Sequence, residues 1–199
     1  MIHGRPTPNY KRLLNPDELR SSLLAASLFV MAFETLKEQV VEHIHMLHWS
    51  GFDESGWKYD EAEYQRDVLS LHKNPFRASL LRFQKFNAID DADLRRIEEL
   101  TILRNRLVHD LWDALSADQP LEWAQRFSDL VDVLRKVEVW WLVNYELEGN
   151  PELEGKVIDE DAIVPGSVMM LRILSDVALA SDDEAWALYN SVFNTRDPA

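Results

Sequence analysis

The chain has 199 residues, and its 21 lysines and arginines against 35 aspartates and glutamates give a net charge of −14. This length suits one domain with a substantial core, while the negative charge argues against a protein that coats nucleic acid non-specifically. The absence of cysteine excludes disulfides, thiolate nucleophiles and cysteine-ligated zinc. Residues 1–16 lack a signal-peptide core and no uninterrupted apolar run reaches roughly 18 residues, so we expect a soluble, cytoplasmic protein.

A long helix is predicted near the N-terminus. Asn15 is a good capping residue, Pro16 suits the first helical position, and two acids follow in the first turn. Apolar residues then recur at intervals of three and four from Leu19 to about His48, which is the strongest helical pattern in the chain. We therefore expect one helix over this whole stretch.

A loop and two shorter helices are predicted next. Residues 49–59 hold two glycines among polar and aromatic side chains, which is typical of a loop. Asp60 is placed to cap a helix that ends near His72. The pair Asn74-Pro75 repeats the capping pattern and predicts a helix to about Phe86.

Two longer helices are expected to complete the bundle. Asp90 or Asp91 can cap a helix whose apolar residues keep a helical spacing to Leu115, and Gln119-Pro120 marks its end. Pro120 then opens a helix that ends near Tyr145. Four main helices of this kind can close one hydrophobic core.

The C-terminal part is predicted to be an appendage to that bundle. Residues 146–164 are acidic, contain glycine and proline, and predict a mobile connection. Helices are expected over residues 168–180 and 182–193. The sequence therefore predicts an all-α protein, with a helical domain at residues 1–147 and an acidic linker and helical extension at residues 148–199 that pack on the same domain.

The helix predicted to begin at Asp90 or Asp91 contains a heptapeptide that combines a fixed cation, an amide and an imidazole. This heptapeptide, called the motif below, is Arg104-Asn105-Arg106-Leu107-Val108-His109-Asp110. On a helix Asn105 and His109 are four residues apart and share a face, while Arg104 lies about 140° around the axis from His109. The surrounding segment, residues 73–109, carries 8 basic and 5 acidic groups, whereas residues 110–199 carry 6 and 19. The motif thus lies in the basic segment of an acidic chain.

The spacing of Arg104 and His109, with the polar Asn105 after the arginine, resembles the Rx4-6H signature of HEPN domains. These are all-α proteins, many of which are metal-independent ribonucleases. The resemblance covers residues 16–145 and implies an up-and-down bundle of four to five helices that forms a homodimer, with Arg104 and His109 of both subunits lining a shared cleft. It also implies RNA as substrate, no cofactor or metal, and a place in toxin–antitoxin, defence or stress systems with an antitoxin or regulatory partner.

The residue types suit RNA cleavage by attack of the neighbouring 2′-hydroxyl. That reaction needs a group that accepts the hydroxyl proton and positive charge on the phosphorane. An unperturbed imidazole titrates near pH 6.5, so His109 can serve as base or acid around neutrality. Arg104 supplies a permanent charge and a planar fork of donors, and Asn105 can hold the imidazole or donate to the phosphate.

Additional RNA contacts are expected from Arg106, Arg82 and Lys85. The alternative is that the basic residues of this segment are ordinary solvated charges. Some of them would then be paired with acids, as Arg95 is expected to be with Glu99. For the motif itself, the alternative is an ordinary helix surface with an exposed Arg106–Asp110 pair. If the motif is only such a surface, the protein would be a non-catalytic helical module that binds a protein partner or a nucleotide. Nearby Phe76, Phe83 and Phe86 are expected in the core rather than as platforms for bases.

Two further features bear on metal binding and on the oligomeric state. Glu42 and His45 have the E-x-x-H spacing of di-iron bundles, with His48 three residues on, but no second E-x-x-H exists. We therefore expect no metal site there, only a terminal cluster of partly exposed histidines. Trp140 and Trp141 cannot both face one side of a helix, so one ring is expected to cover a loop or a second subunit. No tyrosine-bearing extension of the kind seen in some HEPN toxins follows His109.

Overall fold

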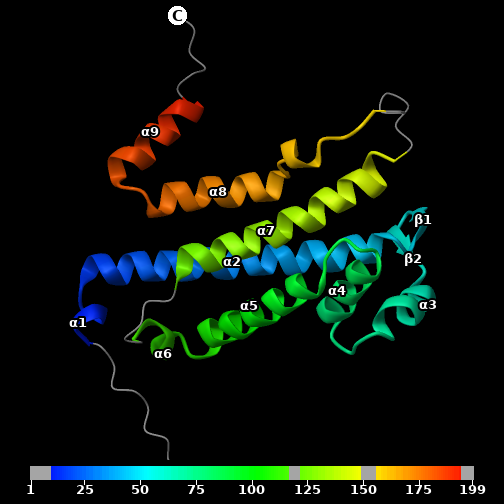
Figure 1. Ribbon diagram of the computed structural model, residues 1–199, viewed down its shortest axis with the longest axis horizontal. Coiled ribbons are helices and arrows are strands. Elements are labelled where there is room, and N and C mark those ends of the chain that lie inside the picture. Colours follow the sequence, from blue (N-terminus) through cyan, green and yellow to red (C-terminus); the bar gives the residue numbers. More distant parts are fainter. Residues whose placement is uncertain (1–9, 117–121, 149–155, 194–199) are drawn as a thin grey trace, which may run out of the picture.

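The computed structural model describes residues 10–116, 122–148 and 156–193, and these are mostly helical with one small sheet (Figure 1). This confirms the all-α class. The helices are α1 (Tyr10–Leu13), α2 (Pro16–Met46), α3 (Glu61–Tyr64), α4 (Pro75–Lys85), α5 (Asp91–His109), α6 (Leu111–Leu115), α7 (Trp123–Trp141), α8 (Gly166–Leu179) and α9 (Asp182–Phe193), the strands are β1 (Trp49–Asp53) and β2 (Gly56–Tyr59), and η1 (Gln65–Leu69), η2 (Leu142–Glu146) and η3 (Glu160–Ala162) are short π- or 3₁₀-helical segments.

Helix α2 is the centre of the molecule, as its long apolar pattern predicts. The Asn15 side chain caps it by accepting a hydrogen bond from the backbone N–H of Asp17 at 3.1 Å. Along its length α2 contacts α4, α5, α7 and α8 (Figure 1). By length and mean hydropathy, 1.4, α2 could also cross a membrane, but core helices of soluble proteins pass the same test. Its buried side chains face the bundle.

Residues 49–59 form an antiparallel hairpin, so the predicted loop is wrong at this point. Trp49 pairs with Tyr59 and Asp53 pairs with Gly56. Gly56 has φ of 110°, a conformation that favours glycine. Most side chains of both strands are exposed. The hairpin therefore lacks the alternation of buried and exposed residues by which strands are recognised in a sequence.

The helix with the Arg104–His109 motif begins as predicted but ends earlier. Asp90 and Asp93 form a reciprocal capping box at the start of α5. Asp110 has φ −135° and ψ 44°, outside the helical region, so α5 ends at His109 and the short α6 follows. The predicted continuation to Leu115 is therefore wrong. The predicted boundary at residues 119–120 lies outside the described residues.

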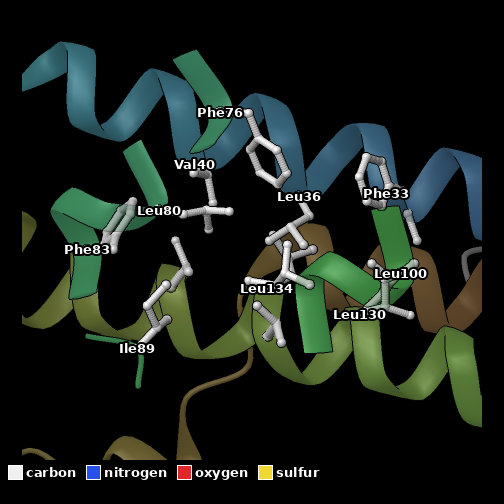
Figure 2. Packing of buried hydrophobic residues seen from close by; sticks show 14 of the residues in the cluster. Phe33, Leu36, Val40, Phe76, Leu80, Phe83, Ile89, Leu100, Leu130 and Leu134 are labelled. Carbon is white, nitrogen blue, oxygen red and sulfur yellow. The ribbon is translucent and has the colours of Figure 1, made fainter. Parts of the chain in front are cut away.

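The hydrophobic core lies where α2, α4, α5 and α7 meet (Figure 2). Its largest fully buried side chains are those of Phe29, Leu36, Val40, Ile44, Val68, Leu80, Phe83, Ile89, Ile97, Leu100, Leu130 and Leu134. The predicted helices at residues 60–72, 74–86, 168–180 and 182–193 correspond to α3 with η1, α4, α8 and α9.

The C-terminal extension is attached to the bundle through α8. Val168 and Leu171 are buried in the core, and α8 packs against α2 and α7. The Arg135 guanidinium on α7 donates hydrogen bonds to the backbone carbonyls of Ile163, at 3.1 Å, and of Asp161, at 3.1 Å, just before α8. Helix α9 lies beyond α8 and points away from the bundle (Figure 1).

Candidate functional site

Arg104 turns from α5 toward α2, where it forms an ion pair with Glu34. Arg104 Nε donates to Glu34 Oε1 at 2.8 Å, and Nη2 donates to the same oxygen. The guanidinium also lies 5.9 Å from the centre of the buried Phe33 ring. On the other side Nη1 donates to Asn105 Oδ1 at 3.3 Å. The candidate arginine is therefore held by groups from two helices.

Glu34 is shared between two cations. Its Oε2 accepts a hydrogen bond from Lys37 Nζ at 3.3 Å, while Oε1 binds Arg104. Partial burial acts to raise the pKa of Glu34, but the hydrogen bonds and charges of Arg104 and Lys37 outweigh it. The pKa of Glu34 therefore lies below its usual value. The two cations therefore favour the ionised form of this carboxylate.

His109 is exposed at the last position of α5. Among the described residues its imidazole has no hydrogen bond or ion pair. It follows Arg104 by five residues, a rise of about 7.5 Å and a rotation of about 140°, so the two side chains leave the helix from different faces. Asn105 shares the face of His109, yet its carbonyl oxygen binds Arg104. Among the described residues, Asn105 therefore contacts Arg104 and not the imidazole that it was predicted to hold.

Arg106, Arg82 and Lys85 are placed differently with respect to the motif. Arg106 is exposed beside it, and Asp110 contacts Arg106 through a backbone hydrogen bond of 2.8 Å. Arg82 and Lys85 lie on α4, which ends before α5 begins. The 19 residues of α5 rise about 27 Å from Asp91 to His109. Within one chain, Arg82 and Lys85 are therefore not brought to His109.

Arg82 instead belongs to an aromatic cluster. Its guanidinium lies 4.7 Å from the centre of the Phe86 ring, and that ring stacks on Trp140. Phe76 and Phe83 are buried, which confirms that they belong to the core. The predicted Arg95–Glu99 pair is wrong: Glu99 pairs with Arg126, at 3.4 Å.

Two hollows flank the Arg104–Glu34 pair along α2. One is apolar, has a volume of about 380 Å³, and is lined by Leu23, Ala26, Ser27, Val30, Met31, Leu107 and Leu111. The other is more polar, has a volume of about 680 Å³, and is lined by Glu34, Lys37, Glu38, Val41, Glu42, His45, Tyr59, Asn74, Pro75 and Phe76. The ion pair lies one helical turn from the apolar hollow, because Met31 precedes Glu34 by three residues and Leu107 follows Arg104 by three.

The histidines near the end of α2 each have partners of their own. His45 Nε2 lies 3.2 Å from Glu61 Oε1, and its ring stacks on Tyr59. His48 is buried, with Nδ1 3.0 Å from the carbonyl oxygen of Ile44, so the expectation of partial exposure is wrong for it. In the described ranges no group of three histidine or carboxylate side chains is placed to hold a metal ion.

Both rings of the Trp140-Trp141 pair pack within the chain. Trp140 lies against Phe83 and Phe86, and the buried Trp141 stacks on His43. Trp141 is therefore covered within the chain, whereas Trp140 is half-buried, and a contact of one ring with a second subunit stays a prediction. The exposed tryptophans are instead those at positions 49, 57, 112 and 186.

Sequence reasoning missed Glu34 and Lys37, which lie some 70 residues before the motif. One signal was present: Glu34 is the single charged residue between Arg20 and Lys37 in an otherwise apolar and small-residue stretch. An isolated acid in a helix that lines the core needs a partner of opposite charge. The sequence did not indicate which cation that partner is.

Comparison with protein-family models, with curated proteins and with solved structures gives no match. The arrangement of Arg104, Asn105 and His109, and the resemblance of their spacing to the HEPN signature, are therefore the features that point to a function.

Proposed function

We propose that this chain is a HEPN-like bundle and a metal-independent endoribonuclease that acts as a homodimer. The observation that carries the proposal is the state of the two motif side chains: Arg104 is held in place by Glu34 and Asn105, whereas His109 is exposed and without a partner among the described residues. An oriented cation for the phosphate and an accessible imidazole are the two groups that the chemistry requires.

The proposed reaction uses no group beyond these side chains. His109 accepts the proton of the 2′-hydroxyl as its oxygen attacks the adjacent phosphorus, and then donates this proton to the departing 5′-oxygen. Arg104 stabilises the negative charge that builds on the phosphorane oxygens. The bond from phosphorus to the 5′-oxygen breaks, which leaves a 2′,3′-cyclic phosphate and a 5′-hydroxyl. In this proposal the exposed Arg106 binds a neighbouring phosphate.

The dimer is proposed to form over the apolar hollow between α2 and α5. Leu23, Met31 and Leu111 line this hollow and are exposed, and the exposed Trp112 follows Leu111. Arg104 and His109 leave α5 about 140° apart around its axis, and we propose that the two groups that act on one phosphate come from two chains. A second copy seated on this surface brings a second α5 close to the first, as the HEPN resemblance implies.

Trp112→Glu is expected to convert the dimer into a monomer, because the charge would be buried in the proposed interface. Sedimentation at micromolar concentration measures this. The matched control is Trp186→Glu on α9, since Trp112 and Trp186 are exposed to 56% and 63%. The control should remain dimeric. If Trp186→Glu is monomeric and Trp112→Glu is still dimeric, the interface lies on the C-terminal extension instead.

Incubation of the protein with mixed RNA in EDTA tests the activity itself. We expect fragments that carry 2′,3′-cyclic phosphate and 5′-hydroxyl ends, because the proposed nucleophile is the 2′-hydroxyl. An RNA with a 2′-deoxy sugar before the cleavage site should stay intact. Fragments with 5′-phosphate ends, or cleavage that EDTA abolishes, would contradict the mechanism.

A second candidate function is a non-catalytic module that binds a protein partner or a nucleotide. The Arg104–Glu34 pair favours it, because this arginine already has a structural partner. RNA that stays intact under all conditions would favour this candidate. In either case, the resemblance leads us to propose a cytoplasmic toxin, defence or stress protein with an antitoxin or regulatory partner.

A further inference from the structure

We propose that Glu34 is the positioning residue for Arg104, and that it fixes the guanidinium so that its remaining N–H groups face the scissile phosphate. This inference rests on the proposed ribonuclease function and assigns a role to a residue outside the motif. The role is indirect, because Glu34 acts through Arg104.

The contacts of Arg104 form a chain of four polar side chains. Lys37 donates to one oxygen of Glu34, Glu34 binds Arg104 through its other oxygen, and Arg104 donates to Asn105. The guanidinium plane is also placed near the Phe33 ring. A long side chain with contacts on two edges loses most of its rotamer freedom before a ligand arrives.

The donors of Arg104 are only partly used by these contacts. A guanidinium has about five N–H donors. Two are directed to Glu34 and one to Asn105, which leaves the others without a partner among the described residues. The Asn105 amide nitrogen is a further donor beside them. The arrangement therefore leaves donors for phosphate oxygens while the carboxylate holds the opposite edge.

The place of the pair at the surface supports a role beyond folding. The side chains of Arg104 and Glu34 are 25% and 39% exposed, and the pair lies between the apolar and the polar hollow. An arginine that is held by a carboxylate and still partly exposed beside two hollows can be reached by a ligand.

The test compares Glu34→Gln with Glu38→Gln. Glu38 is exposed one turn further along α2 and lines the same polar hollow, so its replacement removes an equal charge without a contact to Arg104. Both variants should bind RNA equally well or slightly more tightly, because each removes a negative charge. We expect kcat to fall at least tenfold in Glu34→Gln alone, with KM unchanged or lower. Glu34→Asp, which keeps the charge, should recover part of the loss.

A second readout does not depend on activity. The Nε–H signal of Arg104 in a nitrogen–proton NMR spectrum should be sharp and protected in the native protein and in Glu38→Gln, and lost in Glu34→Gln. Equal kcat values for Glu34→Gln and Glu38→Gln in a protein that cleaves RNA would overturn the positioning role and leave the ribonuclease proposal intact. A native protein that cleaves no RNA would overturn both.

Discussion

Replacement of His109 by alanine is expected to slow RNA cleavage about 10³-fold, the usual effect of losing a general acid or base. The imidazole is exposed at the end of α5 and has no hydrogen-bond partner among the described residues, so its loss should leave the fold intact. Single-turnover cleavage of one defined RNA measures the rate, and thermal unfolding measures the stability. We expect the melting temperature to be unchanged.

The control for this variant is Val108→Ala. Val108 is the exposed neighbour of His109 on α5 and has no group that transfers protons. Its replacement should leave the cleavage rate within a factor of about two of native, far less than the effect of a lost proton-transfer group. The sedimentation of both variants should match that of the native protein, which separates chemistry from dimerisation. A His109→Ala protein that cleaves RNA within tenfold of the native rate would remove His109 from the mechanism.

The helices were predictable where a cap and an apolar stripe occur together. Asn15, Asn74 and Asp90 each cap a helix through their side chains, as their positions before an apolar pattern predict. The end of α5 was not predictable in this way. The apolar spacing of four continues on both sides of Asp110, through Leu107, Leu111 and Leu115. The apolar pattern therefore gives no sign that α5 ends at His109.

The candidate site was predictable only in part. The spacing of Arg104, Asn105 and His109 is a local property, and helix geometry alone separates the faces of Arg104 and His109. The contact with Glu34 is not local, because it joins two helices whose packing is set by the whole core. Arg82 illustrates the same limit: its basic charge suggested a phosphate contact, but tertiary packing placed it over Phe86.

A fall in pH from 7 to 4 is expected to destabilise the protein through His43, apart from any effect on catalysis. The His43 ring stacks on Trp141 with 4.5 Å between ring centres, and its Nε2 is buried without a hydrogen-bond partner in the part of the chain that the structure describes. Burial lowers the pKa of His43 from 6.5 to about 4. Protonation therefore puts an unpaired charge between α2 and α7.

The sign of this effect follows from proton binding. Between pH 6.5 and about 4 the unfolded chain binds a proton at His43 that the folded chain does not bind, so stability falls as pH decreases through this window and levels off below it. One pKa unit corresponds to about 1.4 kcal/mol, so the loss amounts to no more than about 3.5 kcal/mol. His43→Phe keeps an aromatic ring against Trp141 and has no charge to gain.

Urea unfolding of the native protein and of His43→Phe at several pH values measures this loss. Glu34, whose lowered pKa also makes stability fall as pH decreases, is present in both proteins, so the difference between the two curves isolates His43. We expect the free energy of unfolding to fall more steeply in the native protein between pH 6.5 and 4, and the two curves to run parallel above pH 7. Parallel curves over the whole range would mean that the buried imidazole gains its proton without leaving Trp141, and that the contact between α2 and α7 tolerates the charge.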